Sequence, residues 1–206
     1  MRLPDSFRFA LAAGLLAAAG TIGLGQQPSP VPASGPSVAL SVRAEEFVLG
    51  KQVMRLYLNC DTNKAVVLVP TDFRADASTP GKATFTAPDG SCFLGIRLVP
   101  DGGLSPEAVR LQALRRFPGA VVSREHNEFV CGRSAPGLDL TWASSSGTSQ
   151  SVRVAYAATP FGILEFSAIS GAPGFKSTCA QLSVLLASFR TNEGGKLEIV
   201  PVPDKS

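Results

Sequence analysis

The stretch SREHNEFVCGRSAPG, residues 123–137, brings together residue types that nucleophilic catalysis uses. It holds the only histidine of the chain, His126, with Cys131 and Ser134 after it. A histidine beside a thiol or a hydroxyl can take its proton and so activate it as a nucleophile. The stretch therefore raises the hypothesis of a thiol- or serine-dependent enzyme.

The spacing of His126 and Cys131 argues against such a pair. Residues 120–131 are predicted to form a β-strand, and side chains five positions apart on a strand point to opposite faces. A thiolate and its base must instead lie within hydrogen-bonding distance. We therefore expect His126 to be a surface histidine on a polar strand face and Cys131 to be a disulfide partner. A thiol-dependent enzyme at Cys131 remains the weaker alternative.

The segment GRSAPG around Ser134 is similar to a nucleophile elbow, which requires G-x-S-x-G on a strand-to-helix turn. Here the second glycine, Gly137, comes one position late, and a strand is expected to follow it. We therefore expect Ser134 to have no catalytic role.

Oxygen and nitrogen ligands are too sparse to predict a metal site. The segment DTNKAV begins like a calcium loop but lacks the third oxygen ligand, the glycine and the distal glutamate. One histidine cannot build a His-rich zinc centre. We expect Asp72, Asp76 and Asp89 to lie in solvated turns. The sequence thus predicts no metal and no cofactor.

Four cysteines survive removal of the N-terminal segment described below, and an even number favours disulfides in an oxidising compartment. They lie too far apart for a CxxC redox or zinc motif. Four cysteines allow three pairings, and the sequence does not choose among them. The disulfide candidates are Cys60, Cys92, Cys131 and Cys179.

The N-terminus has the pattern of a secretory signal peptide. A short basic start precedes the apolar run FALAAGLLAAAGTIGLG and then polar QQPSP. We expect cleavage before Gln26 or earlier, near Ala17 to Ala19. An uncleaved anchor is the alternative, although the run is at or below the ~17 to 25 residues of a spanning helix. We therefore expect an exported protein, periplasmic or extracellular, without membrane insertion after cleavage.

The length and the charge of the chain limit the number of domains and the kinds of partner that it can have. At 206 residues with 45% hydrophobic residues, it suits one domain plus non-globular sequence. The net charge of +3 comes from scattered residues, which does not indicate nucleic acid. We assign 1–25 to the signal peptide, 26–37 to a Pro/Ser-rich linker, 38–192 to the domain and 193–206 to a C-terminal tail or edge strand.

Apolar periodicity predicts strands and two helices within the domain. A Pro-Asp-Gly turn inside 82–100 marks a hairpin. The helix at 105–117 has Ser105 as its N-cap and Pro106 at its first position, and 175–190 has apolar residues at helical spacing. The predicted strands are 47–59, 65–70, the two arms of 82–100, 120–131, 137–143, 151–159 and 161–170.

Two features suit a partner surface. Arg110, Arg115 and Arg116 are expected to face solvent, where a guanidinium pairs well with carboxylate or phosphate. Trp142, the only tryptophan, is expected to anchor the core or to form a ligand platform. The apolar side chains expected to face the core are Ala108, Leu111, Leu114 and Phe117 on the first helix, and Phe175, Cys179, Leu182, Leu186 and Phe189 on the second.

The order of these elements, several strands, a helix, a four-strand meander and a closing amphipathic helix, predicts an α+β fold. We expect a single domain in which an antiparallel β-sheet is flanked by helices.

The chain resembles the Mog1/PsbP/DcrB-like group in three segments. These are VVLVPTDFR, the helix SPEAVRLQALRRF followed by GAVVSRE, and GILEFSAISGAPGFKSTCAQLSVLLASFR. The resemblance covers about residues 65–192 and implies an antiparallel sheet flanked by helices, in accessory or binding subunits rather than enzymes. It carries over no functional residue. The chain departs from common bacterial members by lacking a lipidation cysteine and by having four core cysteines.

These observations predict an exported, non-catalytic accessory or binding domain whose partner is a protein or a cell-envelope component. The alternative is a small-ligand carrier with a pocket between the sheet and the C-terminal helix. A dry, filled core at that seam would exclude the carrier.

Overall fold

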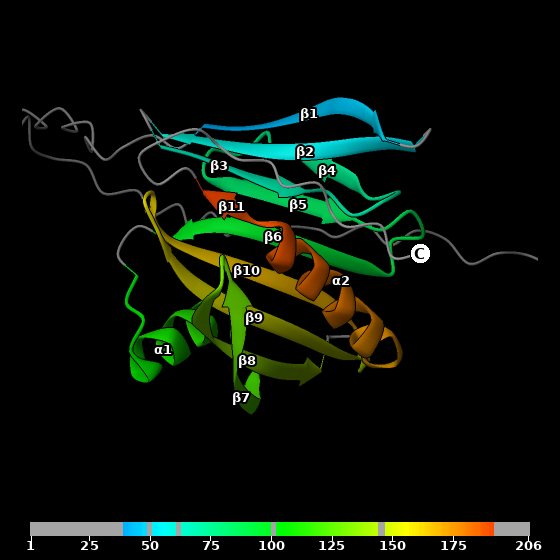
Figure 1. Cartoon of the computed structure of the whole chain (residues 1–206). Coiled ribbons are helices and arrows are strands. Elements are labelled where there is room, and N and C mark those ends of the chain that lie inside the picture. The colour runs from blue at the N-terminus through cyan, green and yellow to red at the C-terminus, as the bar shows by residue number, and fades with distance from the viewer. Residues whose placement is uncertain (1–38, 49–50, 61–62, 100–101, 144–146, 192–206) are drawn as a thin grey trace, which may run out of the picture. The chain divides into compact units, whose positions relative to one another are not determined.

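Two antiparallel sheets and two α-helices make up the described part of the chain (Figure 1). The structure is a computed structural model, and it describes residues 39–48, 51–60, 63–99, 102–143 and 147–191. The expected signal peptide, linker and C-terminal tail lie outside the described residues and stay predictions. The α+β class predicted from the sequence is confirmed.

The smaller sheet has the strand order β1-β2-β3-β11, and the larger one has the order β4-β5-β6-β10-β9-β8-β7. The smaller sheet comprises β1 (Ala39–Val48), β2 (Lys51–Cys60), β3 (Asn63–Leu68) and β11 (Arg190–Thr191). The larger sheet comprises β4 (Arg74–Asp76), β5 (Lys82–Thr86), β6 (Cys92–Val99), β7 (Val121–Val130), β8 (Arg133–Ala143), β9 (Ser149–Thr159) and β10 (Gly162–Gly171). The helices are α1 (Pro106–Arg116), the short 3-10 helix η1 (Ala172–Gly174) and α2 (Phe175–Ser188).

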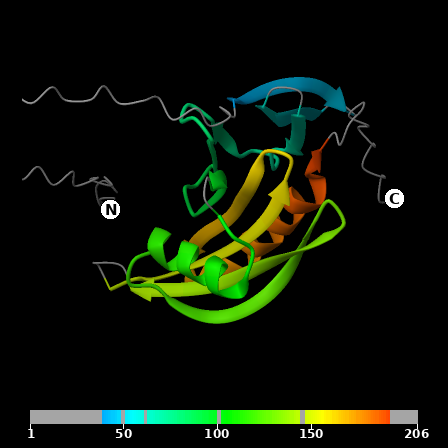
Figure 2. The same cartoon turned by 90° about the vertical axis from the view of Figure 1, so that its left-hand side faces the viewer.

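The helices α1 and α2 cover opposite faces of the larger sheet. On β9, Val154 packs in one apolar cluster with Val109 of α1. The next residue, Ala155, packs in a second cluster with Leu182 of α2. Because successive side chains of a strand point to opposite faces, the sheet must separate the two helices. Figure 2 shows the strands of the meander between them.

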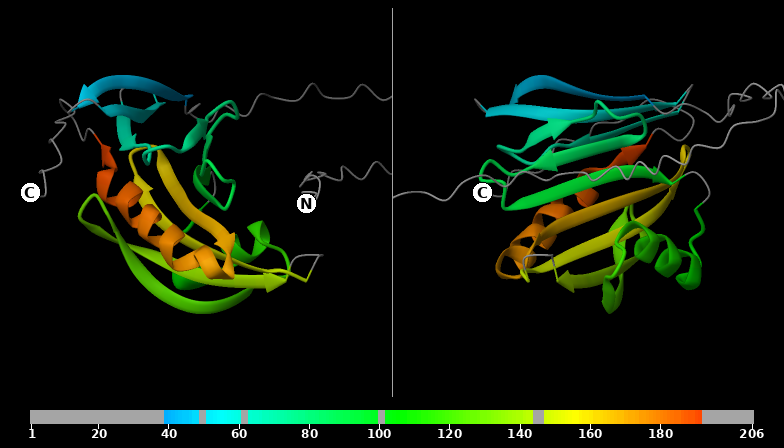
Figure 3. Two further views of the ribbon diagram at one scale, coloured as in Figure 1. Left: turned by 90° about the vertical axis from the view of Figure 1, so that its right-hand side faces the viewer. Right: turned by 180° about the vertical axis from the view of Figure 1, so that it is seen from behind.

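The helix α2 also joins the two sheets. Its buried Leu185 shares an apolar cluster with Leu56 of the smaller sheet and Phe166 of the larger one. At the end of α2, Phe189 meets Phe166 edge to face, with ring centroids 5.2 Å apart. Each large side chain buried in this way contributes about 1.5 to 3 kcal/mol of hydrophobic free energy. Figure 3 shows α2 running alongside the larger sheet toward the smaller one.

Most predicted elements are confirmed, with differences in the first strands. The predicted strand 47–59 is wrong as one element, because β1 ends at Val48 and pairs back on β2. The short β4 was not predicted. The hairpin of β5 and β6, the helix α1 and the four-strand meander all occur where the sequence places them.

The turn between β7 and β8 also differs from the prediction. Cys131 and Gly132 have positive φ values of 51° and 73°, and Val130 pairs directly with Arg133. Two consecutive positive φ values define the tight two-residue turn that suits the twist of a hairpin. The segment GRSAPG is therefore mainly strand, with Ser134 inside β8 rather than on a turn.

The helix α1 begins as predicted but presents a partly different face to the sheet. Ser105 Oγ accepts a hydrogen bond from the Ala108 amide at 3.2 Å, as an N-cap should. The residues that α1 buries are Val109 and Ala113, whereas Leu111 is 51% exposed. The predicted apolar face is therefore wrong at Leu111, whereas Leu114 and Phe117 pack against the core as predicted. The inward stripe of Val109 and Ala113 continues to Arg116.

Arg116 faces inward because a buried carboxylate lies under α1. Glu165, on β10, has no solvent exposure and forms an ion pair with Arg116. Arg97 Nη2 donates to Glu165 Oε2 at 2.8 Å, and the Tyr156 hydroxyl donates to the same oxygen at 3.0 Å. Burial lowers the pKa of Arg116 to about 10, which leaves it charged at neutral pH. The prediction that Arg116 points to solvent is wrong.

A comparison of two neighbouring arginines tests this anchor. We expect Arg116→Met to lower the free energy of unfolding by about 3 kcal/mol, near the cost of removing one partner of a buried ion pair. The control, Arg115→Met on the exposed face, should change it by less than about 0.5 kcal/mol. Urea unfolding measures both, and equal effects would contradict the inward anchor.

Candidate functional site

A transverse row of charged side chains crosses β7, β8 and β9 on the face that α2 covers. Arg124 pairs in register with Asp139, and Asp139 with Arg153. The register shifts between Val122 and Arg124, and such a bulge re-aims the side chains that follow it. Val122 packs against the α1 cluster, whereas Arg124 lines the α2 side. The bulge therefore brings Arg124 into the row.

Asp139 is held by two neighbours. Arg153 donates to both of its oxygens, from Nε to Oδ1 at 2.7 Å and from Nη2 to Oδ2 at 2.9 Å. His126 Nε2 lies 3.2 Å from Oδ1. Burial by itself would raise the pKa of Asp139, but the hydrogen bonds from Arg153 and His126 outweigh burial and hold this pKa well below its usual value. The hydrogen bonds to Asp139 raise the pKa of Arg153. Both groups are charged at neutral pH.

His126 is part of this network and not the surface histidine that we predicted. Its side chain is 9% exposed, and its Nδ1 lies 3.6 Å from Glu128 Oε1. Glu128 also accepts a hydrogen bond from Arg153 Nη1 at 3.2 Å. A Cβ on the facing Gly137 would lie 2.6 Å from His126 Cε1. The imidazole can therefore lie over β8 only because residue 137 has no side chain.

A pocket with a volume of about 440 Å³ lies over the charged row, between α2 and the sheet. The carrier hypothesis requires a space between the sheet and the C-terminal helix. A filled core at this seam would have excluded that hypothesis, but the structure has a pocket there. The helix lines the pocket with residues between Phe175 and Ser183, and the sheet contributes the charged row. The lining residues are Arg124, Asp139, Arg153, Phe175, Lys176, Cys179, Ala180 and Ser183.

The thiols are poor nucleophiles in this environment. Burial raises the pKa of Cys179 to about 11 and also raises that of Cys131. Cys131 is exposed as a residue, but its Sγ donates to the Phe189 carbonyl oxygen at 3.2 Å, whereas His126 contacts Asp139 and Glu128. The structure therefore does not bring His126 to Cys131, as the strand spacing predicted.

The predicted disulfides are not formed in this structure. Cys92, Cys131 and Cys179 are free thiols, and the side chain of Cys60 lies outside the described part. Cys92 is buried at the start of β6, Cys179 lines the pocket and Cys131 lies in the turn after β7.

The remaining candidate residues lie apart from the pocket. Ser134 is exposed on β8. Asp76 and Asp89 accept hydrogen bonds from the Ser78 and Ser91 amides at 2.9 Å each, which are local turn contacts. Within the described residues, no group of three or more His, Cys, Asp or Glu side chains is placed to hold a metal ion.

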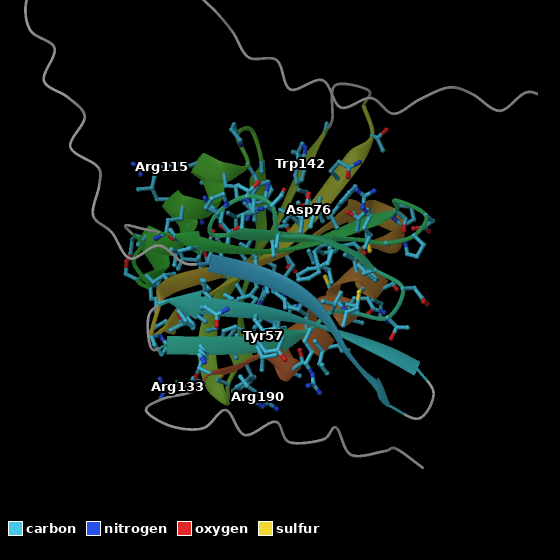
Figure 4. All side chains as sticks on the ribbon, turned by 90° about the horizontal axis from the view of Figure 1, so that it is seen from above. Tyr57, Asp76, Arg115, Arg133, Trp142 and Arg190 are labelled. Atoms are coloured by element: carbon cyan, nitrogen blue, oxygen red, sulfur yellow. The ribbon has the colours of Figure 1, made fainter. Side chains whose placement is uncertain are left out.

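The predicted partner surface is divided by the fold. Arg110 pairs with Glu125 at 3.3 Å, and Arg115 is exposed. Trp142 is partly buried and stacks on Phe117, with ring centroids 5.7 Å apart, so it packs as a core anchor. Figure 4 shows Arg115 and Trp142 on the side away from Arg133 and Arg190.

The fold and site define an α+β protein with a polar pocket beneath its last helix. No protein-family model and no curated protein matches the chain. Its fold is similar to that of the cyanobacterial PsbP protein CyanoP from Synechocystis sp. PCC 6803, at 12% identity and a TM-score of 0.44, over 82% of this chain and 100% of that one. PsbP is one of the proteins that give the sequence resemblance its name.

Two other solved structures show a similar likeness. LpqN of Mycobacterium tuberculosis, described as involved in cell envelope biogenesis, matches at 13% identity and a TM-score of 0.41, over 70% of this chain and 94% of that one. A Bacteroides thetaiotaomicron VPI-5482 protein matches at 15% identity and a TM-score of 0.43, over 64% of this chain and 46% of its own length. These likenesses assign no site and no activity.

Among the residues that the structure describes, neither α-helix has the length and apolar character needed to cross a membrane.

The depressed pKa of Asp139 predicts a dependence of stability on pH. The pKa of the Asp139 carboxyl is near 3.8 in the unfolded chain and lower in the folded protein. The ion pair therefore contributes its full stability above about pH 4. As the pH falls below this value, the unfolded chain is protonated before the folded protein is, and the contribution decreases. We expect Asp139→Asn to be less stable than wild type near neutral pH, and the difference to shrink below about pH 4. Denaturant unfolding at several pH values measures the difference in free energy of unfolding between the two proteins. A difference that does not change with pH would contradict the ion pair.

A methyl group at residue 137 should displace the histidine. We expect Gly137→Ala to destabilise the protein by about 1 to 3 kcal/mol, because the new Cβ overlaps the imidazole and the Val154 carbonyl. The imidazole resonances of His126 should shift in NMR spectra. The control, Gly171→Ala, has its nearest neighbour at 3.9 Å and should leave both readouts unchanged.

Proposed function

We propose that the chain is a non-catalytic binding domain that holds a small ligand in the pocket between α2 and the larger sheet. One observation carries the proposal: a pocket of about 440 Å³ lies over a row of charged side chains on this seam. Ligand sites in proteins are concave spaces of about 300 to 1,000 Å³ with a few placed polar groups. The pocket has the required volume and three cationic side chains.

The state of the reactive groups supports binding rather than catalysis. A general base must reach the proton that it takes, but His126 is held between Asp139 and Glu128. The thiol of Cys179, which lines the pocket, has a pKa near 11 and stays protonated at neutral pH. A thiolate is the nucleophilic form of cysteine. The pocket walls are therefore suited to holding a ligand.

Export is part of the proposal and rests on the sequence. Residues 1–25 have the pattern of a signal peptide, so the binding domain would work in the periplasm or outside the cell. Docking to a protein or a cell-envelope component is the second candidate function. It is supported by two large apolar side chains on the edge strand β7, Val121 at 67% and Phe129 at 69% exposure.

Blocking the pocket tests the proposed function. We expect the full chain, purified from its native source, to carry a small molecule that native mass spectrometry detects as added mass. Ala180→Trp should lose it, because the indole would fill the pocket that Ala180 lines. The matched control is Ala187→Trp, an exposed alanine of α2 that is outside the pocket lining, and it should keep the molecule. A wild-type protein without added mass, or equal retention by Ala180→Trp, would count against the pocket.

A further inference from the structure

The charges of the pocket lining do not cancel. Its charged members are the cations Arg124, Arg153 and Lys176 and the anion Asp139. Arg153 is committed to Asp139 and Glu128 through three hydrogen bonds. This ion pair neutralises the carboxylate in the wall. The field inside the pocket therefore comes mainly from Arg124 and Lys176.

Arg124 is left without a partner because its cross-strand neighbour is saturated. Asp139 lies directly opposite Arg124, and a directly opposed pair of unlike charges normally interacts. Here Arg153 binds both oxygens of Asp139, and His126 approaches one of them. Among the described residues, the side chain of Arg124 has no hydrogen-bond or ion-pair partner. Its five donors remain available to a ligand.

Lys176 approaches the same space from the opposite wall. It lies in the first turn of α2, whose N-cap Gly174 makes no side-chain capping bond. The ammonium forms no hydrogen bond or ion pair with any residue in the described ranges. Two cations, one on a strand and one on a helix, thus border one pocket, and a charged cleft of one sign raises the local concentration of oppositely charged ligands.

The rest of the lining is apolar or weakly polar. Phe175 borders the pocket beside Lys176, and Ala180 and the protonated thiol of Cys179 continue that wall along α2. Such a wall favours the apolar part of a ligand, since removing apolar surface from water is favourable. It also gives few partners to a ligand that is polar throughout.

We propose that the pocket takes a small oxyanion, a carboxylate or a phosphate ester, joined to an apolar group. The oxyanion binds Arg124 and Lys176 and the apolar group packs on Phe175. This inference rests on the proposed function and names the ligand class of the same pocket. The carboxylate and phosphate sources share the chemistry that these cations recognise.

Four probes of similar shape but different charge test whether binding depends on the charge of the ligand. Each is titrated into the purified full chain by calorimetry, and the probes are benzoate, phenyl phosphate, benzamide and benzylamine. We expect benzoate or phenyl phosphate to bind at least about ten-fold more tightly than benzamide or benzylamine, because only the two anions offer charged oxygens to Arg124 and Lys176. The stronger of the two anions identifies the source. The binding should weaken as salt is raised.

Charge reversals locate the binding. Arg124→Glu and Lys176→Glu should each weaken the anion at least about ten-fold, and Arg124→Gln is the milder variant should the reversal disturb β7. The control, Arg115→Glu, reverses an exposed cation on the other face of the sheet and should change affinity by less than about two-fold. Equal weakening by Arg115→Glu would show attraction by the overall field and overturn the inference.

The outcomes separate the inference from the function on which it rests. If benzamide binds as tightly as benzoate and Ala180→Trp abolishes both, the pocket binds ligands and the anion inference is wrong. If no probe binds while a molecule still co-purifies with wild type, the proposed function stands and the ligand class is wrong. If no probe binds and no molecule co-purifies, both are wrong.

Discussion

A carboxylate taken out of water in the middle of a sheet must have its opposite charge beside it, and both faces of the larger sheet are organised around this constraint. On one face Glu165, with no solvent exposure, is paired with Arg97 and Arg116. On the other face Asp139 is paired with Arg153. An unpaired buried charge costs several kcal/mol. Each buried carboxylate therefore requires a cationic side chain next to it.

The two carboxylates affect their helices differently. Under α1, the second cation that Glu165 needs comes from the helix itself, so the ion pair fixes which face of α1 meets the sheet. Under α2, Asp139 receives its cation from the neighbouring strand, and α2 contributes no partner. The helix is held there by apolar contacts, through Leu182, Leu185 and Leu186.

The sequence predicts those parts of the fold that follow from local rules. Period-two apolar segments, the Ser105 cap and the Pro-Asp-Gly turn place most strands and both helices correctly. The face of α1 is missed in part: Leu111 is apolar and predicted to face the core, but the structure exposes it and places Arg116 against Glu165 instead. A single charged residue in the middle of an apolar strand is the signal that could have shown this. Glu165, Asp139 and Arg153 each have that position in their strands.

The site could not be predicted in full, because it depends on pairing between strands. His126 and Cys131 are apart, as the spacing predicted, although Cys131 lies in the turn after β7 rather than on the strand. The bulge after Val122 places the side chains before it on the opposite faces from those that simple alternation predicts. Strand register then decides that Arg124, Asp139 and Arg153 form one row. Neither the bulge nor the register can be read from composition or spacing within a single segment.

The position of the pocket follows from the position of the charged row. The second half of α2 meets apolar strand residues such as Ala155, Leu164 and Phe166, and it packs down on them. The first half crosses the part of the sheet where Asp139 and Arg153 take the place of apolar side chains. A helix that closed fully over this row would remove both groups from water, at a cost that apolar packing does not offset. The space between α2 and the sheet is therefore the consequence of a paired charge on the core-facing side of the meander, and Arg124 stays accessible in it because Asp139 already has its partner.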